Sequence, residues 1–156
     1  MNMNLDSCIR RCSIASVLLA LLAGCAGRAA IYTSNPALRK TSAQFAADAA
    51  KRHPYKADAP RGGAIAGRTQ IEYMFHYLEV VNLSDAAWDN FEVWLNQKYV
   101  VFVPKLEKGQ LERLNFPMFF DDSGVSFSSD MSKGRIEKVE IYNDGKMYDV
   151  TKQLAD

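Results

Sequence analysis

Hydrophobic positions in the second half of the chain follow the two-residue period of β-strands. Ile71, Tyr73, Phe75 and Tyr77 alternate with polar residues, as in a strand that is buried on one face. The phase of this alternation changes over residues 78–81. We therefore expect a bulge there, or a strand that passes from one sheet to another.

Further apolar segments of strand length follow, separated by turn residues. They cover residues 89–95, 99–103, 111–116, 125–127, 136–142 and 146–150. The unbroken apolar run at 99–103 predicts a central strand that ends at Pro104. Asn143-Asp144-Gly145 predicts a hairpin, because Asp and Gly accept the positive φ angles of a tight turn. About seven short strands at near-regular spacing predict a mainly β fold, a small antiparallel β-sandwich over residues 69–156.

Residues 35–68 show a different pattern, which predicts one helix and a linker ahead of the sandwich. Asn35-Pro36 suits the N-cap and first position of a helix, and the alanine-rich residues 37–52 carry a thin apolar stripe. The helix is expected to stop before His53-Pro54, because a residue that precedes proline avoids the helical region. Prolines and glycines are frequent in residues 53–68 and indicate a linker or a loosely draped segment.

An uninterrupted apolar run occupies residues 14–23, and Arg10 and Arg11 precede it. A basic region followed by about 7–15 apolar residues is typical of a secretory signal. The run is shorter than the roughly 20 residues that a transmembrane helix needs. An uncleaved anchor is the alternative, and the paired arginines leave twin-arginine export as an alternative to the general secretory route.

The apolar run ends in Leu22-Ala23-Gly24-Cys25, which resembles the lipobox of bacterial lipoproteins. The resemblance implies that residues 1–24 are a cleaved signal peptide, and that Cys25 carries a diacylglyceryl group and an N-acyl chain. Two or more acyl chains hold a protein stably at a membrane, so residues 25–34 would be a lipidated tether. In that family Ala26, in place of an aspartate, points to the outer membrane, on its periplasmic or surface face. The alternative is an ordinary buried cysteine.

The strand region resembles small immunoglobulin- or fibronectin-like modules of uncharacterised envelope lipoproteins. Val80–Asp85 with Trp88, and Val93–Tyr99, carry this resemblance. It implies a β-sandwich, and no activity follows from it.

Charge is distributed unevenly, although the net charge of +1 gives no reason to expect nucleic-acid binding. Residues 26–68 hold eight Lys or Arg against two Asp, whereas residues 69–156 hold nine basic and fifteen acidic residues. The basic segment would be drawn to anionic headgroups. Alternatively, it docks on its own acidic sandwich or is simply solvated. Cys8 and Cys12 leave with the signal and Cys25 takes the lipid, so we expect no disulfide.

Catalytic and metal-binding motifs such as HExxH, GxSxG and a Walker loop are missing from the sequence. His53 and His76 are the only histidines, and His76 has an outward phase. Asp121–Gly124 is expected to be a turn, because it lacks the ligand spacing of a calcium loop. Glu137 and Glu140 have opposite phases, so they should not converge for acid–base chemistry. We therefore expect no catalytic residues, no metal and no cofactor besides the lipid.

Three aromatic residues, Trp88, Trp94 and Tyr99, flank one turn region and are candidates for ligand contact. An exposed aromatic strip would suit a sugar or a protein, whereas burial of both tryptophans would remove it. The sequence therefore predicts a lipid-anchored envelope protein whose non-catalytic β domain binds partners or supports structure. The alternative is a carbohydrate-binding module, followed by an accessory subunit of an envelope complex or an enzyme. The expected partners are the membrane and envelope proteins or glycans.

Overall fold

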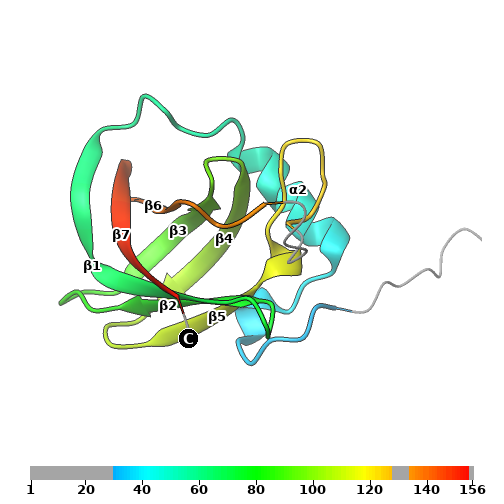
Figure 1. Cartoon of the computed structure of the whole chain (residues 1–156), viewed down its shortest axis with the longest axis horizontal. Helices are drawn as coiled ribbons and strands as arrows, with labels where there is room; N and C mark the ends of the chain where they lie inside the picture. Colours follow the sequence, from blue (N-terminus) through cyan, green and yellow to red (C-terminus); the bar gives the residue numbers. More distant parts are fainter. Residues whose placement is uncertain (1–29, 128–133, 155–156) are drawn as a thin grey trace, which may run out of the picture.

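A computed structural model describes residues 30–127 and 134–154, so the predicted signal peptide and lipobox, with Cys25, lie outside the described residues. The described chain is mainly β, as predicted, with one α-helix and two 3-10 helices (Figure 1). The elements follow in the order η1 (Pro36–Leu38), α2 (Ser42–Arg52), β1 (Arg61–Glu72), β2 (Tyr77–Asn82), β3 (Trp88–Leu95), β4 (Tyr99–Leu106), β5 (Leu111–Asn115), η2 (Phe116–Met118), β6 (Val139–Asn143) and β7 (Lys146–Leu154). In these residues no helix has the length and apolar character needed to cross a bilayer.

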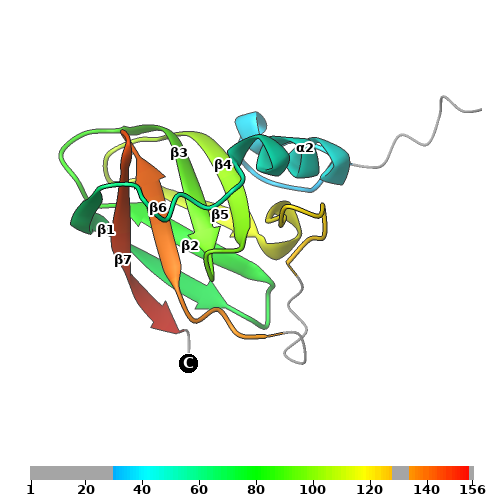
Figure 2. The ribbon, with the colours of Figure 1, turned by 90° about the horizontal axis from the view of Figure 1, so that it is seen from above.

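All seven strands belong to one mixed sheet in the order β4-β3-β6-β7-β1-β2-β5. Neighbouring strands are antiparallel except β1 and β7, which are parallel. The sheet curls around a shared core, so that the body is nearly barrel-shaped (Figure 1 and Figure 2). The expected antiparallel sandwich is therefore not confirmed, because hydrogen bonds join all strands in one sheet and one pair is parallel.

The long strand β1 lies between β7 and β2 and so connects β4-β3-β6-β7 with β2-β5 in the sheet. It pairs with β7 through two register shifts, between Arg61 and Ala64 and between Ala64 and Arg68. β1 begins at Arg61, inside the segment that we expected to be a linker. Its first half is largely exposed and rich in Gly and Ala, so it lacks the apolar alternation that marks the other strands.

The stretch predicted as one continuous strand over residues 69–81 is instead a hairpin. β1 ends at Glu72, residues 73–76 turn, and β2 pairs back on β1 with Glu72 opposite Tyr77. His76 lies in this turn with φ 62°, rather than on the outer face of a strand. The aromatic alternation continued through the turn, which hid the strand ends.

Strand β4 lies at an edge of the sheet and not at its centre, and it continues past Pro104 to Leu106. An edge strand tolerates proline, because one row of its backbone groups has no partner strand. Its apolar residues are nevertheless covered, since α2 packs on it with the Arg52 guanidinium 4.1 Å from the centre of the Phe102 ring. Residues 125–127 lie outside the sheet, with Ser126 forming a single bridge to Phe120.

The predicted helix is divided into two parts. Asn35 caps the short η1 by accepting a hydrogen bond from the Ala37 N–H. Thr41 and Gln44 then form a capping box that starts α2 at Ser42. The helix ends at Arg52, before His53-Pro54, as predicted. The β6–β7 hairpin is also confirmed, with φ 51° at Asp144 and 77° at Gly145.

Candidate functional site

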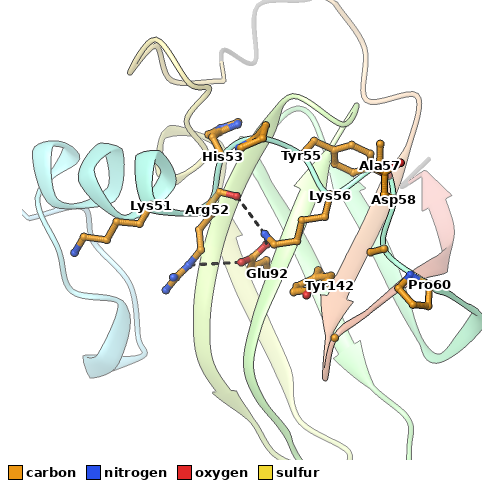
Figure 3. Close-up of a pocket in the computed structure, with 13 residues that line it drawn as sticks. Lys51, Arg52, His53, Tyr55, Lys56, Ala57, Asp58, Pro60, Glu92 and Tyr142 are labelled. Carbon is orange, nitrogen blue, oxygen red and sulfur yellow. Dashed lines mark hydrogen bonds and ion pairs between the residues drawn. The ribbon is translucent and has the colours of Figure 1, made fainter.

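The segment that joins α2 to β1 crosses the outer face of the sheet, passing over β6 (Figure 2). Together with Glu92, Tyr142 and Gly145 it lines an open hollow of about 670 Å³ (Figure 3). Alternation along β3 positions the floor of this hollow, because Glu92 and Trp94 point away from the face that carries Phe91 and Val93.

Glu92 is 6% exposed and lies between two cations, Arg52 at the end of α2 and Lys56 of the overlying segment. The Lys56 Nζ is 2.7 Å from its Oε2, and the Arg52 Nε is 3.7 Å from its Oε1. Trp94 donates its indole N–H to the same carboxylate at 2.9 Å. Figure 3 shows Lys56 and Arg52 converging on Glu92, whereas the neighbouring Lys51 points away.

A second buried carboxylate, Glu140 on β6, lies opposite Trp94 of β3 and is 1% exposed. The Tyr55 hydroxyl donates to it at 2.8 Å, and Arg61 donates to its other oxygen. The Lys138 Nζ lies 2.8 Å from Oε1 of Glu140. The Gln97 side-chain amide donates a hydrogen bond to Oε2 of Glu140 at 3.2 Å.

These donors decide the ionisation of Glu140. Burial by itself raises the pKa of this carboxyl, but hydrogen bonds from Lys138, Tyr55, Arg61 and Gln97 together lower the pKa below its ordinary value. Burial, followed by the bond to Glu140, raises the pKa of the Tyr55 hydroxyl. Glu140 is therefore an ionised acceptor and Tyr55 a neutral donor.

Trp94 lies beneath the same segment and is 0% exposed. The rings of His53 and Tyr55 pack edge-on against it, with centroid distances of 5.1 and 5.2 Å. The His53 ring also places its Nε2 3.4 Å from the carbonyl oxygen of Phe120. The segment is thus held by apolar packing as well as by charge.

We refer to Arg52, Tyr55, Lys56, Arg61, Glu92 and Glu140 as the clasp. A general acid needs a pKa raised toward the working pH, whereas the pKa of Glu140 is lowered and both its oxygens already accept hydrogen bonds. Glu92 is neutralised by two cations. The chemistry that this arrangement supports is attachment of the segment to the sheet.

The clasp also bears on the uneven charge of the sequence. Residues 26–68 were expected to be attracted to lipid, to dock on the acidic body, or to be solvated. For Arg52, Lys56 and Arg61 the structure shows docking. Lys40 instead pairs with Asp48 inside the segment, at 2.7 Å.

The three aromatic candidates do not form an exposed strip. Trp88 is 3% exposed and packs edge-on against Phe91 at 5.6 Å, while Trp94 lies under the clasp at the other end of β3. Tyr99 is partly buried and its ring contacts that of Phe127 at 5.2 Å. Both tryptophans are therefore core residues, which is the outcome that removes the expected sugar-binding strip.

The other candidates also have structural roles. Asp121 closes the expected turn by accepting hydrogen bonds from the Ser123 N–H, the Ser123 hydroxyl and the Val125 N–H. Glu137 is exposed while Glu140 is buried, so the two carboxylates do not converge. In the described part of the chain, no three His, Cys, Asp or Glu side chains gather closely enough to hold a metal ion.

Sequence reasoning missed the pairing of Glu92 and Glu140 with the overlying segment. One signal was Trp94, because a tryptophan on the otherwise polar face of a strand indicates that this face is covered. The opposite charges of residues 26–68 and 69–156 were a second signal, although they did not identify the partners.

Comparisons with known proteins leave the chain without an assigned family. No protein-family model matches it, and neither curated proteins nor solved structures give a match.

Proposed function

We propose that the chain is a lipid-anchored protein of the bacterial envelope whose β domain serves binding or structural support rather than catalysis. The observation that carries the proposal is the lipobox Leu22–Cys25, which ends the apolar run of a secretory signal. Cys25 would carry diacylglyceryl and N-acyl chains, and the domain would face the periplasm or the cell surface from the outer membrane.

The way in which the N-terminal segment joins the body supports a short tether. The Ile31 N–H donates to the Lys40 carbonyl at 2.9 Å, and the Asn115 side-chain amide donates to the Tyr32 carbonyl at 2.8 Å. Ala30, where the described chain begins, is only five positions after Cys25, with four residues between them. At 3.3–3.6 Å per residue, five steps along the chain span at most about 18 Å. Within the expected tether of residues 25–34, the part that we propose to be free of the body runs from Cys25 to Ala30.

The clasp supports a non-catalytic role, because both its carboxylates are paired with cations of the protein itself. Carbohydrate binding was the alternative function, and it depended on an exposed aromatic strip. Since Trp88 and Trp94 are buried, we do not extend the proposal to glycans.

We also infer that the curled sheet is a variant of the immunoglobulin- or fibronectin-like sandwich. At the parallel β1–β7 pair the sheet divides into β1-β2-β5 and β4-β3-β6-β7. With the strands lettered A, B, C, C′, E, F and G in chain order, this is an ABE group against a C′CFG group, close to the immunoglobulin partition. An experimental structure in which β4 and β5 pair directly would contradict this inference.

The test of the lipid anchor is the mass and location of the full chain, expressed in a bacterium that processes lipoproteins. The wild type should begin at Cys25, carry the mass of the acyl chains, and stay with membranes after a high-salt wash. Cys25→Ser should lose the lipid and be released. Cys12→Ser is the matched control, because this residue leaves with the signal. A mature chain that begins upstream of Cys25, or a free thiol at that position, would refute the proposal.

A further inference from the structure

Three large side chains on the surface of the described chain are unusually exposed: Tyr32 (87%), Met74 (83%) and Phe75 (65%). We refer to them as the exposed patch. Tyr32 follows the tether, whereas Met74 and Phe75 form the turn between β1 and β2. Residues far apart in the sequence therefore supply the apolar surface.

Contacts through Asn115 bring these two segments to one surface. Asn115 donates a hydrogen bond to the Tyr32 carbonyl and is the strand partner of Tyr77. The Phe75 ring stacks on that of Tyr77, with a centroid distance of 6.3 Å and an interplanar angle of 18°. A shallow hollow of about 310 Å³ also has both Tyr32 and Tyr77 in its lining.

We propose that the exposed patch rests in the headgroup region of the bilayer that holds the Cys25 lipid, and so sets the orientation of the domain. This inference rests on the proposed lipid anchor. Exposed apolar side chains that gather on one surface of a folded domain mark an interaction surface. The short chain between the patch and Cys25 indicates that the interaction partner is the bilayer that holds the lipid.

Reach is the first argument for a lipid surface. The Tyr32 carbonyl is hydrogen-bonded to Asn115 of the sheet, and the anchored cysteine lies within about 18 Å of Ala30, the extended length of five residue steps. Tyr32 is two residues further along the chain. A membrane that holds the lipid of Cys25 therefore lies within reach of the patch.

Chemistry is the second argument. Tyrosine, with an apolar ring and a polar hydroxyl, is a residue favoured at the level of lipid headgroups. Arg39 is exposed beside the patch, with its Nε 3.4 Å from the Thr33 carbonyl oxygen, and its charge suits anionic headgroups. Arg113 also lines the shallow hollow, but it is paired with Glu79 at 2.8 Å.

The opposite end of the same strands provides an internal control. Leu83 is 58% exposed and directly follows β2, whose other end carries the patch. At about 3.3 Å per residue the six residues of β2 separate the two ends by roughly 20 Å. If the exposed patch lies in the headgroup region, Leu83 therefore lies in water.

The experiment uses the full chain, processed and lipidated in cells and then reconstituted in vesicles of phosphatidylethanolamine and phosphatidylglycerol. Met74→Cys and Leu83→Cys are each labelled with an environment-sensitive fluorophore, since lipid occupies the thiol of Cys25. We expect a blue shift, a several-fold rise in emission, and quenching by spin-labelled lipids at position 74 but not at position 83. Adding Tyr32→Ser and Phe75→Ser to the Met74→Cys protein should return the emission at position 74 to that of water.

The outcomes separate the inference from the anchor on which it rests. Water-like emission at position 74, in protein that floats with the vesicles, overturns the inference and leaves the anchor intact. A shift that disappears as the protein is diluted in the membrane identifies a second copy as the occupant, and also overturns it. Protein that lacks lipid at Cys25 and does not float contradicts the anchor itself, and the inference falls with it.

Discussion

The Nζ of Lys56 lies 2.7 Å from a carboxylate oxygen of Glu92, 36 residues further along the chain. Glu92 belongs to β3 and is almost fully buried, whereas Lys56 belongs to the irregular segment between α2 and β1. A buried carboxylate needs a compensating charge, so removal of the segment would leave Glu92 in an unfavourable state. The attachment of the segment and the stability of the sheet are therefore coupled.

We expect Lys56→Met to lower the free energy of unfolding by about 1.5–3 kcal/mol, the range for a hydrogen bond to a charged group. Of its two cations Glu92 would keep only Arg52, whose Nε lies 3.7 Å away, beside the hydrogen bond from the Trp94 indole. Urea unfolding of the purified protein measures the loss. The combined Lys56→Met and Glu92→Gln variant should lose less than the sum of the two single changes, because the two residues interact directly.

Lys108→Met is the matched control for that experiment. Lys108 pairs with Asp85 at a similar distance, 2.9 Å, but both side chains are well exposed. Exposed pairs contribute little to stability. Equal losses for Lys56→Met and Lys108→Met would show that burial of Glu92 does not strengthen the contact.

Tyr55→Phe removes the hydroxyl that donates to Glu140 at 2.8 Å. We expect a loss of about 1.5–3 kcal/mol near neutral pH. Because the folded pKa of Glu140 is lowered, its contribution is present above the ordinary value of 4.5 and is lost as the pH falls through the folded pKa. The difference in melting temperature between Tyr55→Phe and wild type should therefore shrink in acid. Tyr32→Phe, at an exposed tyrosine, should show no difference at any pH, and a pH-independent effect of Tyr55→Phe would contradict the assignment.

Glu112→Gln should raise the melting temperature at neutral pH. Burial raises the pKa of the Glu112 carboxyl, although hydrogen bonds from the Asn35 side chain and the Arg113 N–H partly offset this. A raised folded pKa means that stability is fully present below the unfolded pKa and is lost as the pH rises through the folded value. Glutamine keeps an oxygen for the Asn35 amide, which donates at 2.6 Å, and carries no charge.

The gain from Glu112→Gln should disappear in acid, where the wild-type carboxyl is protonated. Glu137→Gln, at an exposed glutamate, is the control and should leave the melting temperature unchanged. A melting temperature that falls at neutral pH in Glu112→Gln would show that the charge of this carboxylate stabilises the fold.

Gly67→Ala tests the close approach of β1 to the core. A Cβ at this position would lie 2.4 Å from the Trp88 Cη2 and 2.8 Å from the Val81 carbonyl oxygen. The backbone oxygen belongs to the paired strand β2 and has little freedom to move, so we expect a loss of about 1–3 kcal/mol, typical of overpacking. Thermal unfolding measures it. Ala66→Ser adds one atom at the exposed neighbouring residue and should lower the stability little. A similar loss for Ala66→Ser would show that substitutions in this strand are destabilising in general, and not because of the close contact at Gly67.

Features that depend on a few consecutive residues could be predicted from the sequence. The positive φ angles at Asp144 and Gly145, the helix end before His53-Pro54 and the turn closed by Asp121 are all confirmed. In each case the partner groups lie within a few positions along the chain. Local sterics and side-chain hydrogen bonds are therefore sufficient to specify them.

Pairing between distant segments was decided only by the tertiary structure. The exposed first half of β1 resembles a loop until β7, more than eighty residues later, pairs with it. The apolar residues of β4 suggested a strand at the centre of the sheet. In the structure β4 is an edge strand, and its apolar residues are covered by α2. Trp94 became a core residue because the segment after α2 lies over it.

The sequence by itself therefore determined the β character, the tight turns and the helix ends, because these follow from the conformational preferences of adjacent residues. It also carries Leu22-Ala23-Gly24-Cys25, the local pattern from which we propose the lipid anchor. The single curled sheet, the clasp and the gathering of Tyr32 with Phe75 depend on which distant surfaces meet. Burial and charge pairing decide that choice only when the whole chain folds.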